Sequence, residues 1–102
     1  MSLNKQFLKS KPVCKVKFRL DKSTAPGIES VYLVGDFNDW NENSTPMKRL
    51  KDGSFSAELT LETGRQYHFR YLADGSAWLN DDGADAYSWC EFAQADNSVV
   101  EV

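Results

Sequence analysis

"DGSFSAELTLETGRQYHFRYLADG", residues 52–75, contains the pattern that decides the fold class. In two runs, residues 54–61 and 66–73, apolar and polar side chains alternate with the period of two that is typical of a half-buried β-strand. One Asp-Gly pair precedes the first run, and a second follows the other run. Asp-Gly between alternating runs is the strongest short signal for a hairpin turn, so the stretch predicts antiparallel β structure.

The alternation assigns each side chain to one face of its strand. In the first run the face predicted to point into the core carries Phe55, Ala57, Leu59 and Leu61. In the second run the inward face carries Tyr67, Phe69, Tyr71 and Ala73. The outward face of the second run carries His68, Arg70 and Leu72. The same strand is therefore predicted to supply an aromatic core and a polar outer surface.

Short strands are also predicted on both sides of this stretch. Residues 13–20 alternate strictly, and their inward side chains are Cys14, Val16, Phe18 and Leu20. Further strands are predicted over residues 30–36, 76–80 and 98–102, while residues 86–92 are ambiguous. About seven short strands without a sustained 3.6-residue period are typical of an all-β, antiparallel β-sandwich. We predict one domain over residues 12–102, preceded by a loose leader over residues 1–11, since termini are commonly loose.

Composition and charge exclude several classes of protein. The 41% hydrophobic and 26% charged residues fit a globular domain, and no apolar run approaches the roughly 18–20 residues of a membrane span. Residues 1–22 are basic, but residues 74–102 carry seven acidic and no basic side chains, so the aromatic loops lie in acidic surroundings. Nucleic-acid binders instead show a basic face interleaved with aromatic side chains. Because the N-terminus also lacks the apolar segment of a secretory signal, we predict a cytoplasmic location without nucleic-acid or membrane partners.

Few residues could support catalysis or bind a metal. The one histidine, His68, lies within a predicted strand, where a surface or packing role is commoner than that of a base. The acidic pairs fall in loops, and the turn at Asp81, Asp82 and Asp85 lacks the ligand spacing of an EF-hand. Two cysteines are too few for a disulfide framework. We predict neither catalytic activity nor a metal or other cofactor.

Two tryptophans lie next to loops instead of in the middle of strands. Trp40 follows the strand break at Gly35, and Trp78 follows the second Asp-Gly turn by three residues. Hydrogen-bonding side chains flank both tryptophans, namely Asn38, Asn41 and Asn80. An exposed aromatic ring surrounded by amides suits a sugar. The apolar C–H face of the sugar stacks on the aromatic ring, and its hydroxyls form hydrogen bonds with the amides. The pattern indicates a carbohydrate-binding surface.

The ordered segments "VYLVGDFNDW", "DGSFSAELTL", "GRQYHFRYLADG" and "DNSVVEV" resemble carbohydrate-binding module family 48. These are the isoamylase N-terminal, or early set, domains, related to the glycogen-binding domain of the AMP-activated protein kinase β subunit. The resemblance covers roughly residues 12–102 and implies an immunoglobulin-like sandwich that binds α-1,4-linked glucans such as glycogen or starch. A glucan-metabolising enzyme is the protein partner that it implies.

The resemblance also implies which residues bind the sugar. Trp40 ends the "GDFNDW" motif, Trp78 follows the Asp-Gly turn, Arg70 stands where the kinase domain has lysine, and Asn97 precedes the last strand. Asn38 and Leu72 are expected to border the site. Trp78 lies one residue farther from its turn than in the kinase domain. Trp89 belongs to a segment that departs from the family, and either a third contact or loop packing is open for it.

Three functions remain in view. The first is non-catalytic glucan binding, alone or as a targeting module for a partner enzyme. The second is a structural, protein-interaction module of the same fold without sugar binding. Exposed, coplanar rings at Trp40 and Trp78 would favour the first, and rings packed into the core or against a partner would favour the second. The third, a small hydrolase, would need two carboxylates in a cleft.

Overall fold

The β-strands of this chain are short and follow the alternating runs of the sequence. The computed structural model describes residues 3–21, 23, 27–91 and 94–102. Within them the strands are β1 (Leu3–Phe7), β2 (Val13–Leu20), β3 (Val31–Gly35), β4 (Lys48–Arg49), β5 (Phe55–Glu62), β6 (Gln66–Ala73), β7 (Ala77–Leu79), β8 (Ala86–Cys90) and β9 (Ala95–Glu101). A single turn of 3-10 helix, η1 (Asp36–Asn38), follows β3. This part of the chain contains no helix with the length and apolarity that a membrane crossing requires.

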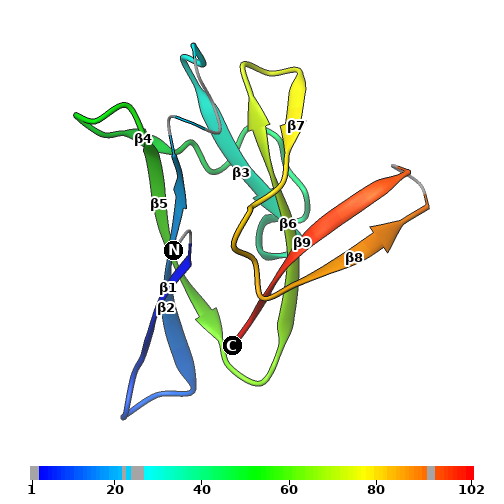
Figure 1. The fold of residues 1–102 in the computed structure, drawn as a ribbon. Coiled ribbons are helices and arrows are strands. Elements are labelled where there is room, and N and C mark those ends of the chain that lie inside the picture. The colour runs from blue at the N-terminus through cyan, green and yellow to red at the C-terminus, as the bar shows by residue number, and fades with distance from the viewer. Residues whose placement is uncertain (1–2, 22, 24–26, 92–93) are drawn as a thin grey trace.

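The strands form two antiparallel sheets that pack as a sandwich (Figure 1). The first sheet has the order β1-β2-β5-β4. The second has the order β3-β6-β9-β8, and β7 pairs with the end of β6 on the edge opposite β3. The predicted all-β, antiparallel β-sandwich is confirmed, with more strands than the seven or so expected. The additional strands are β1 and the two-residue β4, which the sequence did not distinguish from loop.

The core lies between the sheets and contains the predicted inward faces. The buried side chains of β2 are Cys14, Val16, Phe18 and Leu20, and those of β6 include Tyr67, Phe69 and Tyr71. Phe69 stacks edge-on against Phe18 across the sandwich, with ring centres 5.1 Å apart, and against Tyr71 at 5.7 Å. Edge-to-face geometry at this distance is favourable for aromatic pairs. The predicted register of β6 is therefore confirmed.

The predicted loose leader over residues 1–11 is wrong for residues 3–7. These residues form β1, which pairs with β2 from Leu3 opposite Phe18 to Phe7 opposite Cys14. β1 occupies hydrogen-bonding groups that would otherwise be free at the edge of β2, and Leu3 is buried in the core. The sequence LNKQF gives little alternation because Leu3 is its one buried side chain, so the strand has no clear apolar pattern. Residues 1–2 lie outside the described residues.

The second Asp-Gly turn forms the hairpin between β6 and β7. Asp74 and Gly75 have φ angles of 50° and 73°, the left-handed values that a type I′ turn requires at both central positions. One carboxylate oxygen of Asp74 accepts hydrogen bonds from the backbone N–H groups of Glu29 and Ser30. The hairpin is thus tied to the segment before β3, and it places Trp78 directly opposite Leu72.

The acidic loop after β7 is anchored to the core by a buried pair. Tyr71 donates a hydrogen bond from its hydroxyl to Asp81, which is itself buried and also accepts from the backbone N–H of Gly83. Burial raises the pKa of Tyr71 well above its usual value, and the neighbouring Asp81 charge raises it further. Asp81 therefore has a structural role. Within the described residues, no group of three His, Cys, Asp or Glu side chains is arranged to hold a metal ion.

Candidate functional site

The loop after β3 separates its two large aromatic side chains. Gly35 pairs with Phe69 at such close range that a Cβ atom added to it would lie 2.5 Å from the carbonyl oxygen of His68. No other residue fits there, so the chain can turn tightly against β6. Phe37 then packs on the core, with its ring centre 5.6 Å from that of Phe18. Trp40 lies on the other side of the loop, away from the core rings and next to the outward face of β6.

Trp40 is held by hydrogen bonds at its backbone and at its ring. Its backbone N–H donates to the carbonyl oxygen of Gly35 at 2.9 Å, and its indole Nε1 donates to a carboxylate oxygen of Asp36 at 2.8 Å. Both Asp39 and Trp40 have left-handed backbones, with φ angles of 56° and 57°. A residue other than glycine in a sparsely populated region costs about 1–3 kcal/mol, and such conformations cluster at functional sites.

Arg70 lies between the two tryptophans. Its guanidinium carbon is 5.9 Å from the ring centre of Trp40 and 5.3 Å from that of Trp78. Its Nε donates a hydrogen bond of 2.8 Å to the side-chain oxygen of Asn97 on β9. Both ring distances are within the roughly 6 Å range of cation–π attraction, so the guanidinium is held by two indoles and one amide. Three elements, the loop after β3, β7 and β9, thereby converge on the Arg70 cation of β6.

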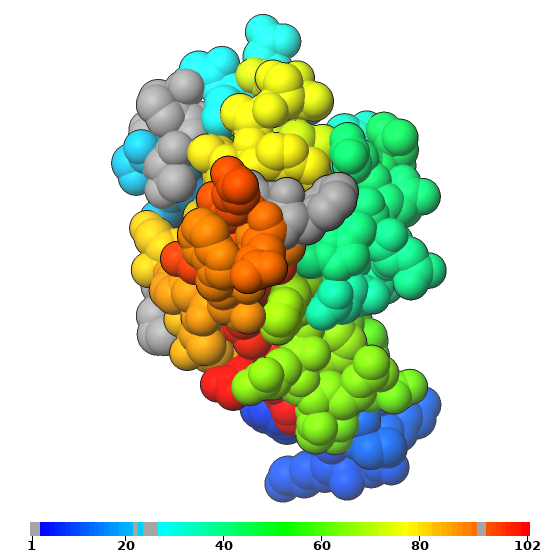
Figure 2. All heavy atoms as spheres, turned by 90° about the vertical axis from the view of Figure 1, so that its right-hand side faces the viewer, coloured from blue at the N-terminus to red at the C-terminus, as the bar shows by residue number. Residues whose placement is uncertain are grey.

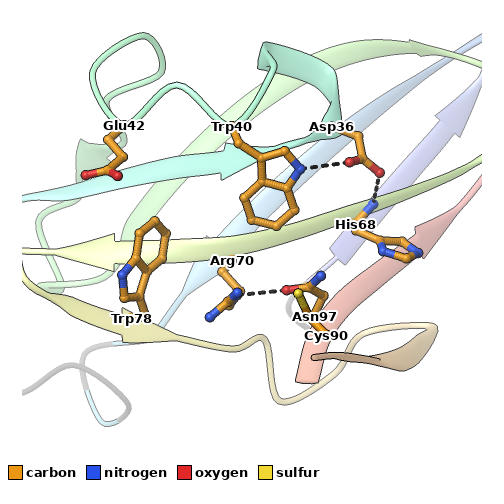
Figure 3. A pocket seen from close by; sticks show the side chains of 8 residues that line it. All are labelled: Asp36, Trp40, Glu42, His68, Arg70, Trp78, Cys90 and Asn97. Atoms are coloured by element: carbon orange, nitrogen blue, oxygen red, sulfur yellow. Dashed lines mark hydrogen bonds between the residues drawn. The ribbon is translucent and has the colours of Figure 1, made fainter. Parts of the chain in front are cut away.

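These groups surround a pocket of about 560 Å³ on the outer face of the second sheet. Figure 2 shows this side of the molecule, where the loop after β3, the β6–β7 hairpin and β8 come together. The side chains that line the pocket are drawn in Figure 3: Asp36, Trp40, Glu42, His68, Arg70, Trp78, Cys90 and Asn97. The Trp78 side chain is 42% exposed, so its ring is accessible from solvent. The pocket thus combines accessible indole rings with carboxylate, amide and guanidinium groups, which is the chemistry that a sugar requires.

The family whose members are described as the glycogen recognition site of AMP-activated protein kinase matches residues 16–99, a range that contains the whole pocket. This chain belongs to that family. The resemblance to carbohydrate-binding module family 48 and to the kinase domain is confirmed, as are the carbohydrate-binding class and the sandwich fold that it implies.

Three curated relatives are 1,4-alpha-glucan branching enzymes. The enzyme of Photobacterium profundum is 38% identical over 90 residues, which cover 87% of this chain and 12% of the enzyme. The enzyme of Aquifex aeolicus is 37% identical over 79 residues, or 74% of this chain and 12% of the enzyme. The enzyme of Deinococcus radiodurans is 38% identical over 64 residues, or 62% of this chain and 9% of the enzyme. The chain thus spans at most 12% of the length of these relatives.

The structure brings four of the six predicted site residues together and separates the other two. Trp40, Arg70, Trp78 and Asn97 line the pocket. Asn38 does not line it. Its amide nitrogen donates to the carbonyl oxygen of Leu33 and to the hydroxyl of Thr45, and its oxygen accepts from the backbone N–H of Gly35. The amide of Asn38 is therefore used to close the loop.

Leu72 also does not border the pocket as expected. It is on the outward face of β6, as alternation predicts, but only 3% of it is exposed. Its cross-strand partners are Tyr32 on β3 and Trp78 on β7, whose side chains share its face. The flanking strands on both sides therefore cover Leu72. Period-two alternation gave the correct face, but pairing of β7 with β6 covers this part of the face.

Four residues line the pocket that were not among the predicted contacts: Asp36, Glu42, His68 and Cys90. His68 had a usable signal, because it precedes Arg70 by two residues and must share its face. Asp36 and Glu42 lie on either side of Trp40 in the sequence, in the polar loop that drew attention to the tryptophan. Cys90 had no such signal, since the end of an ambiguous strand does not show which face it presents.

Trp89 does not line this pocket. It is 62% exposed and precedes Cys90 in β8, so the two side chains point to opposite faces of the strand. Cys90 lines the pocket, and Trp89 therefore lies on the reverse face of the β8–β9 hairpin. Of the two alternatives left open for Trp89, contact with a ligand in the pocket is not supported by its position.

Proposed function

We propose that this domain binds an α-1,4-linked glucan of the glycogen or starch type without cleaving or transferring it. The observation that carries the proposal is the Trp40–Arg70–Trp78 arrangement, in which a cation within about 6 Å of two indole ring centres lines an open pocket. The membership of the chain in a glycogen recognition family and the substrate named for its branching-enzyme relatives support the same class of ligand.

The two tryptophans would stack on the apolar faces of neighbouring glucose rings, while polar groups bond the hydroxyls. Among the described residues, the two Nη groups of Arg70 have no hydrogen-bond partner, so they are available to a ligand. The side-chain oxygen of Asn97 already accepts a hydrogen bond from Arg70, so Asn97 would offer its amide nitrogen to the ligand as a second donor. The carboxylate of Glu42, at the exposed rim, would accept a hydroxyl hydrogen bond.

The expected affinity is modest. Each aromatic stack contributes about 0.5–1.5 kcal/mol beyond burial of area, each neutral hydrogen bond contributes a similar amount, and binding costs subtract several kcal/mol. With the burial of apolar area included, we expect a dissociation constant between micromolar and millimolar, or a binding free energy of about −4 to −8 kcal/mol. A branched polymer presents many such sites, so retention would be strengthened by multiple contacts. Weak, repeated binding suits a module that holds a partner enzyme at the polymer, which is the further role we propose.

The test is native electrophoresis in gels that contain glycogen, amylose or an unrelated β-glucan. We expect the α-glucans to retard the parent chain and the β-glucan to leave it unchanged. The double variant Trp40→Ala/Trp78→Ala, which removes both rings, should migrate as in a gel without polysaccharide. Equal migration of the parent chain in all gels would overturn the proposal and favour the protein-interaction module. Product formed during incubation with glucan would contradict the absence of catalysis. The cytoplasmic location stays a prediction.

A further inference from the structure

Asp36 connects the Trp40 ring to the sheet. One of its carboxylate oxygens accepts the hydrogen bond from Trp40 Nε1 at 2.8 Å, and the other accepts from the backbone N–H of His68 at 2.8 Å. His68 belongs to β6, the strand that also carries Arg70. Figure 3 shows Asp36 on the side of the Trp40 ring away from Trp78, with both of its contacts drawn. A loop residue is thereby connected through its ring to β6, the central strand of the pocket.

We propose that Asp36 is a positioning residue that fixes the Trp40 ring in the orientation in which it stacks on the glucan, an inference that rests on the proposed function. The indole would otherwise rotate about two side-chain torsions on a loop. A hydrogen bond with an ionised acceptor is roughly twice as strong as a neutral one, so this contact favours one orientation over the others. A ring that is already oriented loses less conformational freedom when the ligand arrives.

The position of Asp36 also determines which part of Trp40 can contact a sugar. Because Nε1 donates to Asp36, the indole N–H is not available to a hydroxyl, and Trp40 offers only the face of its ring. Recognition of hydroxyls is left to Arg70 and Asn97. The Trp40 ring is therefore preformed as an apolar platform before any ligand is bound.

Asp39 provides a matched control in the same loop. It is an exposed aspartate with a left-handed backbone, and no hydrogen bond or ion pair of its side chain is present among the described residues. Asp39→Asn removes one negative charge three residues from Asp36, and asparagine tolerates the left-handed region. This variant therefore reports the effect of charge alone, while Asp36→Ala removes charge and clamp together.

The experiment observes the indole N–H signals by NMR, first without ligand and then with maltoheptaose. The chain has three tryptophans, and the signal that disappears in Trp40→Phe identifies Trp40. In Asp36→Ala we expect this signal to shift and to exchange with solvent faster, while Asp39→Asn leaves it unchanged. We expect Asp36→Ala to weaken maltoheptaose binding about tenfold, equivalent to about 1.4 kcal/mol. In the Trp40→Phe background, where no indole N–H exists, the same change should cost less than about twofold.

Each outcome separates the clamp from the proposed function. An unchanged Trp40 signal in Asp36→Ala, or an equal loss of affinity in the Trp40→Phe background, would overturn the positioning role even if the parent chain binds glucan well. If the parent chain does not bind maltoheptaose, the proposed function is wrong, and so is the role of Asp36 in orienting Trp40 for glucan. The ligand-free spectrum still shows whether Asp36 holds the Trp40 ring. Should Asp36→Ala fail to fold, Asp36→Asn, which keeps one acceptor oxygen for two donors, serves in the same measurements.

Discussion

The two faces of β6 carry side chains of similar size in the same strand, but their environments differ completely. On the inward face Tyr67, Phe69 and Tyr71 are buried and pack against rings from β2 and from the loop after β3. On the outward face His68 and Arg70 are half-buried around an open pocket. The comparison teaches that a side chain of β6 affects stability or binding according to what covers its face. Substitutions on the two faces can test that separation.

The largest expected effect is on the inward face. Phe69→Ala removes a ring that contacts Phe18, Phe37 and Tyr71, and the cavity should cost about 3–5 kcal/mol. Domains are stable by only about 5–15 kcal/mol, so this variant should lose a large fraction of its free energy of unfolding. Urea denaturation followed by circular dichroism measures the loss. A variant as stable as the parent chain would mean that the register of β6 is shifted by one residue.

Leu72 tests the comparison because it is the buried exception on the outward face. Leu72→Ala should destabilise the domain by about 2 kcal/mol, the lower end of the range for buried leucines, because the site lies under β7 and can partly collapse. The measurement is again urea denaturation. Leu72 belongs to the binding surface after all if Leu72→Ala is as stable as the parent chain but binds glucan much more weakly.

The next effect should appear in binding without unfolding. Trp40→Ala removes a stacking ring and should weaken maltoheptaose binding by about 2 kcal/mol, roughly 30-fold, while the far-UV spectrum persists. Trp89→Ala is the matched control, since it removes an equally large ring from outside the pocket and should change affinity less than twofold. Isothermal titration compares the two. Equal losses in both variants would place the binding surface on β8, and an unfolded Trp40→Ala would mark that ring as part of the core.

The fold could be predicted from the sequence where one face of a strand is buried and the other is not. Residues 13–20 and 66–73 meet that condition, and their inward faces were assigned correctly. β1 could not be predicted, because its place is set by pairing with β2 and not by an apolar pattern of its own. The same reason explains the ambiguity of β8, an edge strand whose large side chains are exposed.

The site could be predicted as far as composition and alternation reach. The tryptophans stood out because they lay next to polar loops, and Arg70 because it alternated with core rings. Asn38 was misplaced because an amide that closes its own loop has the same sequence signature as one offered to a ligand. Asp36 was missed because its two contacts, to Trp40 and to His68, depend on how closely the loop approaches β6. Such contacts follow from tertiary structure alone.

The smallest predicted effect concerns Arg70, and it separates the charge of this residue from its shape. Arg70→Ala removes the cation between the rings and the hydrogen bond to Asn97, and it should weaken maltoheptaose binding about tenfold, or about 1.4 kcal/mol. Arg70→Lys keeps the charge but lacks the planar guanidinium that lies within about 6 Å of both ring centres. It should cost only about threefold in affinity, or about 0.7 kcal/mol.

Because the Arg70 side chain points away from the core, both variants should melt within a few degrees of the parent chain. Titration calorimetry and thermal denaturation of the three proteins check these outcomes. If Arg70→Lys loses as much affinity as Arg70→Ala, the planar guanidinium is what matters. If either variant unfolds, the outward face of β6 carries stability as well as binding, and the separation of the two faces is wrong.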